Sequence, residues 1–382
     1  MIKKKIFYWS PFIDYVGTKI SSKNSIISLS KFGKEEFSIT VFNVVGEWNF
    51  YLEQLKKLNI EVINFGINKK IPFLKNKGFL FSRILYLKIF LLSFIPLLKI
   101  LRNKKPDFFV ISLITFVPLI INYLFRIKTT VILRISGFPK LTIVRSFFWK
   151  MMLTKVKWIF SPTNNTSNLL KEKFPTHKNK IKFIRDPIFS YEQFLKIKKK
   201  YNRKLKRKNF YLAVGRLTKQ KNFKSLVLAV QKYNMKNKEN MNVLVIGDGE
   251  EKKNLILLSK KLKVEKNIKF LGFRHNKFKY FFKAKALLCT SLWEDPGFII
   301  IEAGISNLPV ISNSCLSGPV EIIDDDKNGY LYKLNSVNSL VKKIQQFEED
   351  KPEIILQKKI NMKIYSRKYS ISKFYKDFTK YV

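Results

Sequence analysis

The chain has 382 residues, of which 46% are apolar and 15% aromatic, so it can build ordered cores, and its length favours two domains over one. It contains 74 Lys and Arg against 27 Asp and Glu, which gives a formal net charge of +47. With only two cysteines and two histidines, a disulfide framework and a structural Cys/His zinc site are excluded, and a reducing, cytoplasmic setting is expected.

Strand-like apolar runs alternate with helical patterns along the whole chain, which predicts an α/β architecture with parallel sheets. The first five residues lead directly into a strand and do not resemble a signal peptide. The strands expected in the first half are 6–8, 37–42, 61–64, 108–113, 130–134 and 158–161. We expect them to form an N-terminal Rossmann-like domain over residues 1–190.

Residues 108–125 carry no charge and reach the length of a membrane-spanning helix. Pro118 lies in the middle, however, and the run begins like a buried parallel strand, so a strand and then a helix from about residue 116 are predicted instead. Residues 82–101 are predicted to form a helix of one of two kinds. It is either an interfacial helix with snorkelling Lys and Arg or an ordinary helix that faces the core.

The charge is unevenly distributed, although a bias towards Lys, Ile, Asn and Phe is also what an AT-rich genome favours. Between Val62 and Leu170 the only acidic residue is Asp107, whereas eighteen Lys and Arg lie between Lys69 and Lys157. Basic residues interleaved with large apolar ones suit an anionic membrane surface. Nucleic acid also accepts a basic surface, but we find no aromatic platform or recognition motif for it. We therefore expect a protein peripheral to the inner face of the plasma membrane.

Residues 191–208 are predicted to be a basic linker between domains, because residues 196–208 contain nine basic residues in thirteen and no acid. A second α/β series follows, with strands expected at 210–214, 242–246, 268–271, 286–290 and 309–312. It predicts a C-terminal Rossmann-like domain over 209–365. Residues 366–382 are expected to form a helix that packs back on the N-terminal domain. Ligands of such sheets bind beyond the carboxyl ends of the strands, which predicts a central cleft between the domains.

Three strand-to-helix turns of the second half have unusual residue content. The first turn places Arg216 and Lys221 after Gly215, which outlines a diphosphate site because Arg offers a bidentate fork and Lys a point charge. A basic loop in a basic protein is the alternative. The second turn, Gly247-Asp-Gly249, begins like a dinucleotide fingerprint, but Lys252 stands where the third glycine belongs. This departure counts against NAD.

The third turn contains two glutamates, Glu294 and Glu302, eight positions apart, with Gly297 and Phe298 at the expected start of a helix. The free amides of that helix favour an anion, whereas carboxylates suit the hydroxyls of a sugar. A nucleotide sugar offers a ribose on one side of its diphosphate and a hexose on the other. Capping of the helix by the two carboxylates is the alternative explanation.

These turns resemble the retaining glycosyltransferase family 4, also called glycosyl transferases group 1, which has the GT-B fold of two Rossmann-like domains. The matching elements are Gly215-Arg216-Leu217 with Lys221, the Glu-x7-Glu pair Glu294 and Glu302, Asn307-Leu308-Pro309, Ser317-Gly318-Pro319 and Asn328-Gly329-Tyr330. In the first half, residues 9–18 and 134–139 are similar to bacterial enzymes of lipopolysaccharide, capsule or exopolysaccharide assembly.

The resemblance implies that Arg216 and Lys221 bind the diphosphate, that Glu302 binds the ribose and that Glu294 binds the transferred hexose. Gly17, Gly215, Gly297 and Phe298 would approach the donor through their backbones. Arg216, Lys221 and Glu294 would be the catalytic residues, with no metal or other cofactor. Asp324-Asp325-Asp326 is interpreted as a solvated turn rather than a metal motif.

The acceptor is expected to bind the N-terminal domain at Arg134, Ser136 and Gly137. Many relatives carry a histidine near the position of Ser136, so the catalytic role of that histidine is not transferable to this chain. The implied reaction moves a hexose from a nucleotide sugar, preferably a UDP-sugar, to a lipid-linked glycan. A GDP-mannose-dependent enzyme, another GT-B enzyme such as an epimerase or phosphorylase, and a basic nucleic-acid-binding protein are the alternatives.

Overall fold

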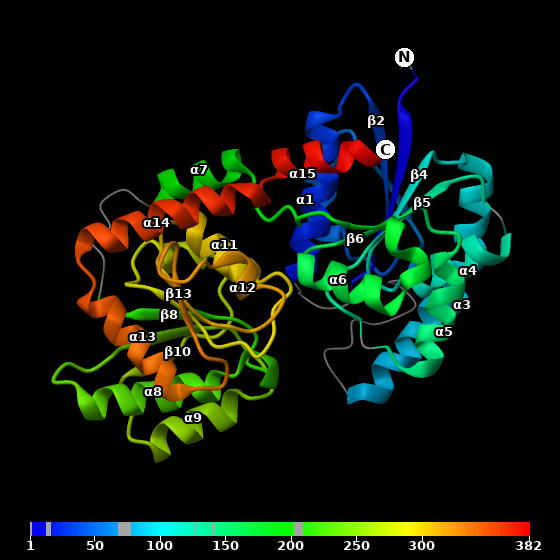
Figure 1. The fold of residues 1–382 in the computed structure, drawn as a ribbon. Helices are drawn as coiled ribbons and strands as arrows, with labels where there is room; N and C mark the ends of the chain where they lie inside the picture. The colour runs from blue at the N-terminus through cyan, green and yellow to red at the C-terminus, as the bar shows by residue number, and fades with distance from the viewer. Residues whose placement is uncertain (1, 13–16, 68–77, 126, 140, 202–208) are drawn as a thin grey trace. The chain divides into compact units, whose positions relative to one another are not determined.

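The structure, a computed structural model, describes residues 2–12, 17–67, 78–125, 127–139, 141–201 and 209–382. The chain divides into two compact units, each with its own sheet (Figure 1). The first unit contains Met1–Pro187 and Ile371–Val382, and the second contains Ile188–Ser370. The predicted α/β architecture with two parallel sheets is therefore confirmed.

The first unit has a seven-stranded parallel sheet in the order β3-β2-β1-β4-β5-β6-β7. Its strands are β1 Lys4–Trp9, β2 Phe37–Asn43, β3 Glu61–Asn64, β4 Phe108–Ile111, β5 Thr130–Arg134, β6 Trp158–Ser161 and β7 Ile181–Phe183. Its helices are α1 Gly17–Phe32, α2 Leu52–Lys57, α3 Gly78–Lys104, α4 Phe116–Phe125, α5 Ile143–Leu153, α6 Asn164–Lys173 and α15 Ile371–Phe378. The strand and helix predicted within 108–125 are confirmed as β4 and α4, and β7 is a strand that the sequence did not predict.

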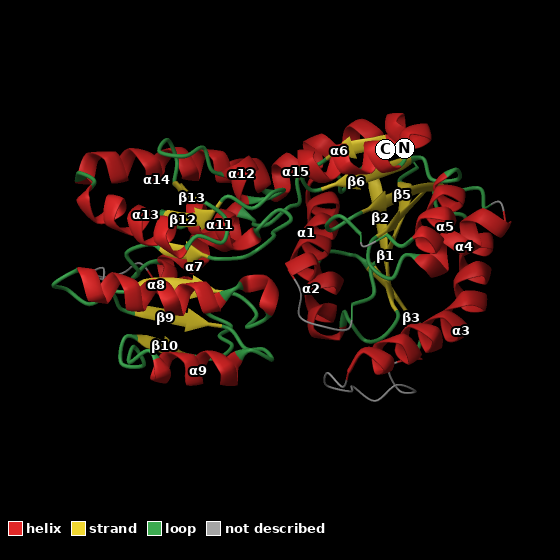
Figure 2. Ribbon diagram, turned by 60° about the horizontal axis from the view of Figure 1, so that its bottom comes forward, coloured by secondary structure: helices red, strands yellow, loops and turns green. Residues whose placement is uncertain are grey.

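Both faces of the first sheet are covered by helices, as alternate residues of β1 show. Ile6 and Tyr8 pack into a core with α1, α2 and α15, whereas Phe7 and Trp9 pack into a core with α3, α4, α5 and α6. Figure 2 shows α3, α4 and α5 along one side of this sheet and α1 and α2 along the other. Burial on both faces explains why the strands are continuous apolar runs rather than alternating ones.

The second unit has a six-stranded parallel sheet in the order β10-β9-β8-β11-β12-β13. Its strands are β8 Tyr211–Val214, β9 Val243–Ile246, β10 Ile268–Phe270, β11 Leu287–Cys289, β12 Val310–Asn313 and β13 Tyr330–Tyr332. Its helices are α7 Tyr191–Tyr201, α8 Phe223–Lys236, α9 Lys252–Lys261, α10 Phe278–Phe281, α11 Phe298–Ile305, α12 Pro319–Ile322, α13 Val337–Glu349 and α14 Pro352–Ser366. Strand β13 is the other strand that the sequence did not predict.

The expected linker at 191–208 differs from the structure, because its first part is the helix α7 of the second unit. Phe194 anchors this helix in a core where its ring contacts Phe278 and Phe282. Because this basic helix has only one buried aromatic side chain, its hydrophobic periodicity is too weak to be recognised in the sequence. Residues 202–208 lie outside the described residues.

The C-terminal residues 371–382 belong to the first unit, while α14 and the turn after it belong to the second. Helix α15 packs against α1, and Ser28 Oγ donates a hydrogen bond to the carbonyl of Ile371 at 2.5 Å. Phe378 is fully buried, with its ring edge-on to Phe160 of β6. The chain thus crosses between its units twice, at residues 187–188 and 370–371.

Candidate functional site

The loop after β8, which contains the Gly-Arg-Leu sequence, is fixed by the loop after β9. Gly215 N donates to Ile246 O at 3.0 Å, and Leu217 N donates to Asp248 O at 2.9 Å. Gly247 has φ +148°, and a Cβ there would lie 1.8 Å from the carbonyl oxygen of Gly215. Only glycine fits this approach. The partial dinucleotide fingerprint is therefore explained by packing between two loops.

Lys221 lies at the end of the same loop and contacts a glutamate of the loop after β11. Its aliphatic stem covers Gly215, where a Cβ would lie 3.3 Å from the Lys221 side chain. Its Nζ donates to Glu294 Oε1 in an ion pair whose side chains are only 16% and 8% exposed. The carbonyl of Lys221 also accepts a bond from Thr290 Oγ1 at 2.8 Å. The structure therefore brings two of the predicted catalytic residues together.

Arg216 is a cation of this loop without a partner among the described residues. It is exposed, and its guanidinium makes no hydrogen bond or ion pair with the residues that the structure describes. The loop that carries it is tied to the loop after β11, because Leu292 N donates to Gln220 O at 2.8 Å and Gln220 Nε2 donates to Trp293 O at 2.9 Å. The loop thus presents a free, forked cation on a fixed backbone.

Glu302 lies in α11 and is 6% exposed. Lys277 Nζ donates to its Oε2 at 2.6 Å. Lys277 precedes α10 in the loop after β10 and was not among the residues predicted from the sequence. The sequence did contain one indication of Lys277. It lies in a loop that follows the carboxyl end of a parallel strand, and ligands of such sheets bind there.

Helix α11 begins at Phe298, and Gly297 before it has φ +97°. A Cβ on Gly297 would lie 3.3 Å from Cβ of Glu294, so this loop is closely packed as well as left-handed. The first amides of the helix have no carbonyl partner inside it and carry the positive end of its dipole. They are therefore suited to a phosphate or a hydroxyl oxygen.

Together these groups form a site with two kinds of chemistry. Arg216 and the amides at the start of α11 attract an anion, while Glu294 and Glu302 accept hydrogen bonds. Each carboxylate is paired with one lysine, which fixes its orientation. An anion flanked by hydroxyl groups fits this arrangement, as the sequence predicted for a nucleotide diphosphate sugar.

The second unit can be assigned to a family by comparison with known proteins. Residues 195–369 match the family described as Glycosyl transferases group 1. This part of the chain belongs to that family. The resemblance inferred from the Gly-Arg-Leu and Glu-x7-Glu elements is confirmed, since both elements lie inside the matched residues.

Two curated relatives support the assignment to the group 1 glycosyl transferases. An uncharacterized glycosyltransferase of Methanocaldococcus jannaschii is 28% identical over 251 residues, which cover 61% of this chain and 61% of the relative. An N-acetylgalactosamine-N,N'-diacetylbacillosaminyl-diphospho-undecaprenol 4-alpha-N-acetylgalactosaminyltransferase of Campylobacter jejuni is 30% identical over 141 residues, 37% of this chain and 38% of the relative. The chain thus spans about three-fifths or less of the length of these relatives.

The likeness in structure extends over the whole chain. The crystal structure of Anabaena HepE in complex with UDP and glucose has a TM-score of 0.69 at 15% identity, covering 99% of this chain and 98% of that one. At this identity the likeness shows a shared fold. The chain therefore has the predicted GT-B fold.

Gly17, which was predicted to approach the donor, and the residues predicted to contact the acceptor lie in the first unit. Gly17 is the exposed first residue of α1, and Ser136 and Gly137 are half-buried in the loop after β5. Their predicted roles stay predictions. His177, which does not lie in that loop of the sequence, donates a hydrogen bond through Nε2 to Lys150 O at 3.1 Å.

Arg134 is placed differently from a ligand-binding residue, because its guanidinium is buried and fully engaged inside the first unit. It donates to Ser25 Oγ at 2.7 Å and to Ser21 Oγ at 2.9 Å, and forms an ion pair with Asp186 at 2.6 Å. It also lies 5.0 Å from the ring centroid of Phe374 in α15. The geometry gives Arg134 a structural role that joins β5, α1 and the C-terminal helix.

A buried acid that the sequence did not single out lies near the carboxyl end of β2. Glu47 is 7% exposed, and burial raises its pKa to about 7. Its Oε2 accepts a bond from Val45 N at 2.7 Å, while its Oε1 has no hydrogen-bond partner among the described residues. The ammonium of Lys19 is the charge that opposes this rise.

The two cysteines and the three consecutive aspartates have structural explanations. Cys289 and Cys315 are buried and unpaired with each other, as expected for a chain without disulfides, and burial raises the pKa of both thiols. The solvated turn predicted at 324–326 is confirmed, since all three aspartates are exposed. Asp325 and Asp326 pair there with Lys343.

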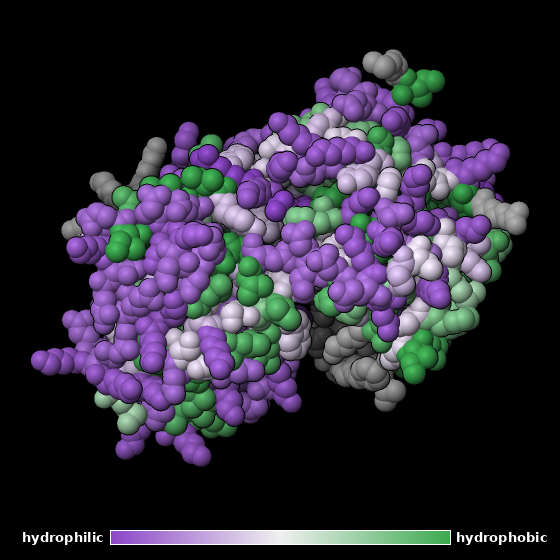
Figure 3. All heavy atoms as spheres, in the orientation of Figure 1, coloured by the Kyte–Doolittle hydropathy of each residue, from purple (hydrophilic) through white to green (hydrophobic). Residues whose placement is uncertain are grey.

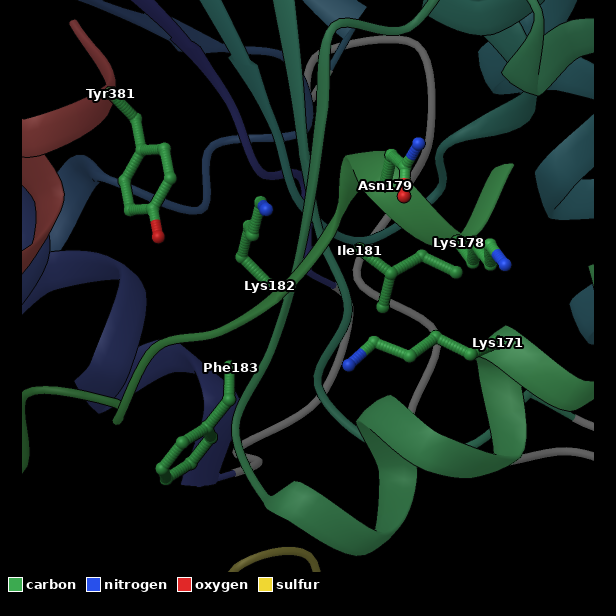
Figure 4. Close-up of a pocket in the computed structure, with 7 residues that line it drawn as sticks. All are labelled: Lys171, Lys178, Asn179, Ile181, Lys182, Phe183 and Tyr381. Carbon is green, nitrogen blue, oxygen red and sulfur yellow. The ribbon is translucent and has the colours of Figure 1, made fainter. Parts of the chain in front are cut away.

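A basic cavity of about 360 Å³ lies in the first unit beside the edge strand β7 (Figure 4). It is lined by Lys171, Lys178, Asn179, Ile181, Lys182, Phe183 and Tyr381. Three ammonium groups and no carboxylate line it, which suits an anion. None of the predicted site residues contributes to it, so it is separate from the nucleotide-sugar chemistry described above.

Proposed function

We propose that the chain is a retaining glycosyltransferase that transfers a hexose from a nucleotide diphosphate sugar to a lipid-linked or growing surface glycan. The observation that carries the proposal is the pair of lysine-held carboxylates, Lys221–Glu294 and Lys277–Glu302, in the family-matched unit. The unpaired Arg216 accompanies them. Cations for a diphosphate and carboxylates for sugar hydroxyls are thus supplied by one set of loops.

In this proposal the cations act on the leaving group. Arg216, which has no internal partner to give up, binds the diphosphate, and Lys221 adds a second charge as the bond to the sugar breaks. Fixed cations that meet developing negative charge lower the barrier more than they favour the ground state. The acceptor hydroxyl attacks the anomeric carbon from the face that the diphosphate leaves. A phosphate oxygen takes its proton, and the anomeric configuration is retained.

The carboxylates act on the two sugars. Glu302 accepts bonds from the ribose hydroxyls, and Glu294 accepts bonds from the hydroxyls of the hexose. Their lysine partners hold both side chains in one orientation before the donor arrives, which reduces the entropy lost on binding. Orientation of the hexose beside the acceptor is the second contribution to catalysis.

A UDP-sugar is the donor we favour, because a whole-chain structural neighbour binds UDP and glucose. GDP-mannose is the alternative donor. The Campylobacter relative named above acts on a diphospho-undecaprenol-linked sugar, which supports a lipid-linked acceptor here. An acceptor of that kind would place the enzyme in the cytoplasm, peripheral to the inner face of the plasma membrane.

A thermal-shift screen across UDP-, GDP- and dTDP-sugars tests the donor. We expect the midpoint of unfolding to rise with UDP-sugars, because a ligand that binds only the folded state stabilises it. A shift with GDP-mannose alone would replace the UDP-sugar with the alternative donor. Product analysis with a lipid-linked glycan would then establish transfer and the anomeric configuration, and an inverted product would contradict retention.

The net charge keeps one non-enzymatic function open, a basic nucleic-acid-binding protein. Such binding would be strongly salt-dependent and would need no glutamates at the carboxyl edge of a sheet. A filter-binding titration with RNA and duplex DNA separates the two functions. Tight, salt-sensitive binding together with no transfer from any nucleotide sugar would favour nucleic acid.

A further inference from the structure

Helix α3 is apolar on the side that faces away from its own unit. Its buried side chains include Ile89, Leu97 and Leu101, which are fully enclosed in the core beneath the sheet. On its exposed side Ile84, Leu87, Leu91 and Ile95 are each 54–64% exposed, at positions i, i+3, i+7 and i+11. A surface helix of a globular protein normally carries polar residues there. This face of α3 is therefore an apolar stripe without a partner in the described residues.

Helix α5 has a second apolar face. Ile143 is 91% exposed, Val144 65%, Phe147 61% and Phe148 54%, and the positions i, i+1, i+4 and i+5 share one side of a helix. Its opposite side is buried through Trp149, Met152 and Leu153. Helix α4 packs against both α3 and α5, so the three helices form one layer. Figure 3 shows hydrophobic side chains gathered over the region of this layer.

The charged residues of α3 and α5 themselves are all basic. Lys88 and Lys99 on α3 and Arg145 and Lys150 on α5 are exposed. In the sequence from α3 to the end of α5 the only acidic residue is Asp107, which accepts a bond from the backbone of Lys5. Exposed apolar side chains with only basic neighbours complement a surface whose headgroups are anionic and whose interior is hydrocarbon.

We propose that the exposed faces of α3 and α5 form one docking surface that lies on a bilayer containing anionic lipid. The apolar side chains enter the boundary between headgroups and acyl chains, and Lys88, Arg145 and their basic neighbours bind the lipid phosphates. This deepens the proposed function and rests on it, because a lipid-linked acceptor is presented at the same surface. Helix α5 lies in the basic region 62–170 that the sequence indicated, but an interfacial helix was predicted only over residues 82–101.

A peripheral position fits α3 better than a spanning one. Within the described residues α3 is long and apolar enough over Ile84–Lys104 to cross a membrane, and 28% of its most apolar window is buried. Crossing the bilayer would remove Ile89, Leu97 and Leu101 from the core that they share with α4 and the sheet. The helix also contains Pro96. Docking leaves those core contacts intact and uses only the exposed stripe.

Vesicle co-sedimentation tests the docking surface directly and needs neither donor nor acceptor. The full chain is mixed with vesicles of phosphatidylcholine alone or of phosphatidylcholine with phosphatidylglycerol. Two double variants remove the apolar faces, Leu91→Ser with Ile95→Ser and Phe147→Ser with Phe148→Ser. The matched control is Leu257→Ser with Ile364→Ser, since these side chains are 64% and 54% exposed in the second unit. Circular dichroism reports whether each variant is folded.

We expect the wild type to bind the anionic vesicles at least tenfold more tightly than the neutral ones. Each docking-surface variant should lose tenfold or more of this binding while the control keeps it. Equal binding by the wild type and both variants, or no binding by the wild type, would overturn the proposal. Wild-type protein that stays bound to the vesicles after carbonate extraction would also overturn the proposal, because it would indicate a spanning helix. If, in the absence of vesicles, the wild type is a dimer and the variants are monomers, the surface would instead be assigned to contact with a second copy of this chain.

The two proposals fail separately. Donor binding measured by thermal shift should be the same in the docking-surface variants and the wild type, because none of the substituted residues lies in the unit that holds Arg216, Lys221 and the glutamates. Vesicle binding without donor binding would leave the docking surface standing and contradict the proposed function. Donor binding and transfer to a soluble acceptor analogue, without vesicle binding, would support the proposed function and contradict the docking surface.

Discussion

Lys221 and Glu294 form a largely buried ion pair that joins the loops after β8 and β11 across 73 residues of sequence. In the proposed function, Lys221 is a cation for the leaving diphosphate and Glu294 a carboxylate for the transferred sugar. Each side chain therefore has two functions, because it orients its partner and is proposed to contact the donor. Substitution of either residue alone should affect folding stability and transfer together.

The double substitution Lys221→Met with Glu294→Gln separates these effects. Removal of one partner of a buried ion pair leaves the other charge uncompensated and costs about 3–5 kcal/mol, whereas removal of both charges costs little. We expect Lys221→Ala to lower the free energy of unfolding and abolish transfer. The double variant should recover the stability but not the transfer. Urea denaturation and a transfer assay measure the two quantities, and substantial transfer by the double variant would refute the site assignment.

Arg216 is exposed and unpartnered within the described residues, so its removal should affect binding without affecting folding. We expect Arg216→Ala to weaken UDP-sugar binding by about 10–100-fold, since hydrogen bonds to charged groups contribute about 1.5–3 kcal/mol. Calorimetric titration measures the affinity, and urea denaturation should give the wild-type stability. The control is Lys219→Ala, which removes an exposed lysine three residues after Arg216 in the same loop. This variant should keep near-wild-type affinity.

Lys277 tests a residue that the structure adds to the site. Lys277→Ala leaves Glu302 without its lysine, so the carboxylate loses its fixed orientation for the ribose. We expect the affinity for UDP to fall about tenfold, as for the loss of one charge-assisted hydrogen bond. The neighbouring exposed lysine gives a matched control, Lys279→Ala. Equal affinities of the two variants would show that the Lys277–Glu302 pair is only structural.

Gly247 is required by the close approach of the loops after β8 and β9. A Cβ there would lie 1.8 Å from Gly215 O, so Gly247→Ala must displace the loop that carries Arg216. We expect destabilisation on the order of 2 kcal/mol and weaker donor binding. Gly272→Ala is the control, because Gly272 also has a positive φ but its nearest contact is 3.9 Å away. If both variants lose the same stability, backbone strain rather than the close approach is the cause.

Glu47 predicts a pH dependence of stability. Its pKa is raised from 4.5 to about 7 in the folded protein, so between these values the folded state holds a proton that the unfolded state has released. The free energy of unfolding therefore falls as the pH rises from about 4.5 to 7. The fall from this residue amounts to about 3 kcal/mol at 1.36 kcal/mol per pKa unit.

Glu47→Gln imitates the protonated carboxyl and removes this dependence. The variant should be more stable than the wild type at pH 8 and nearly equal to it at pH 5. Urea denaturation at the two pH values measures the difference. A variant less stable than the wild type at pH 8 would show that the ionised carboxylate stabilises the fold through Lys19.

The strand positions were predictable because apolar runs that are buried on both faces are visible in sequence, as in β1 and β8. The two missed strands, β7 and β13, are edge strands of three residues each. The linker prediction failed to recognise α7 because only one side chain of this helix, Phe194, is buried. The rings that it contacts, Phe278 and Phe282, are 84 or more residues away in the sequence.

By itself the sequence determined the α/β class, the order of the motifs and the identity of Arg216, Lys221, Glu294 and Glu302 as the chemical groups of the second half. These features depend on residue types and short spacings, which are local. Only the tertiary structure decided the partners. It paired Lys221 with Glu294 and Lys277 with Glu302, enclosed Arg134, and left one face of α3 and α5 uncovered. Pairing and burial depend on which distant segments pack together, and no local pattern records that.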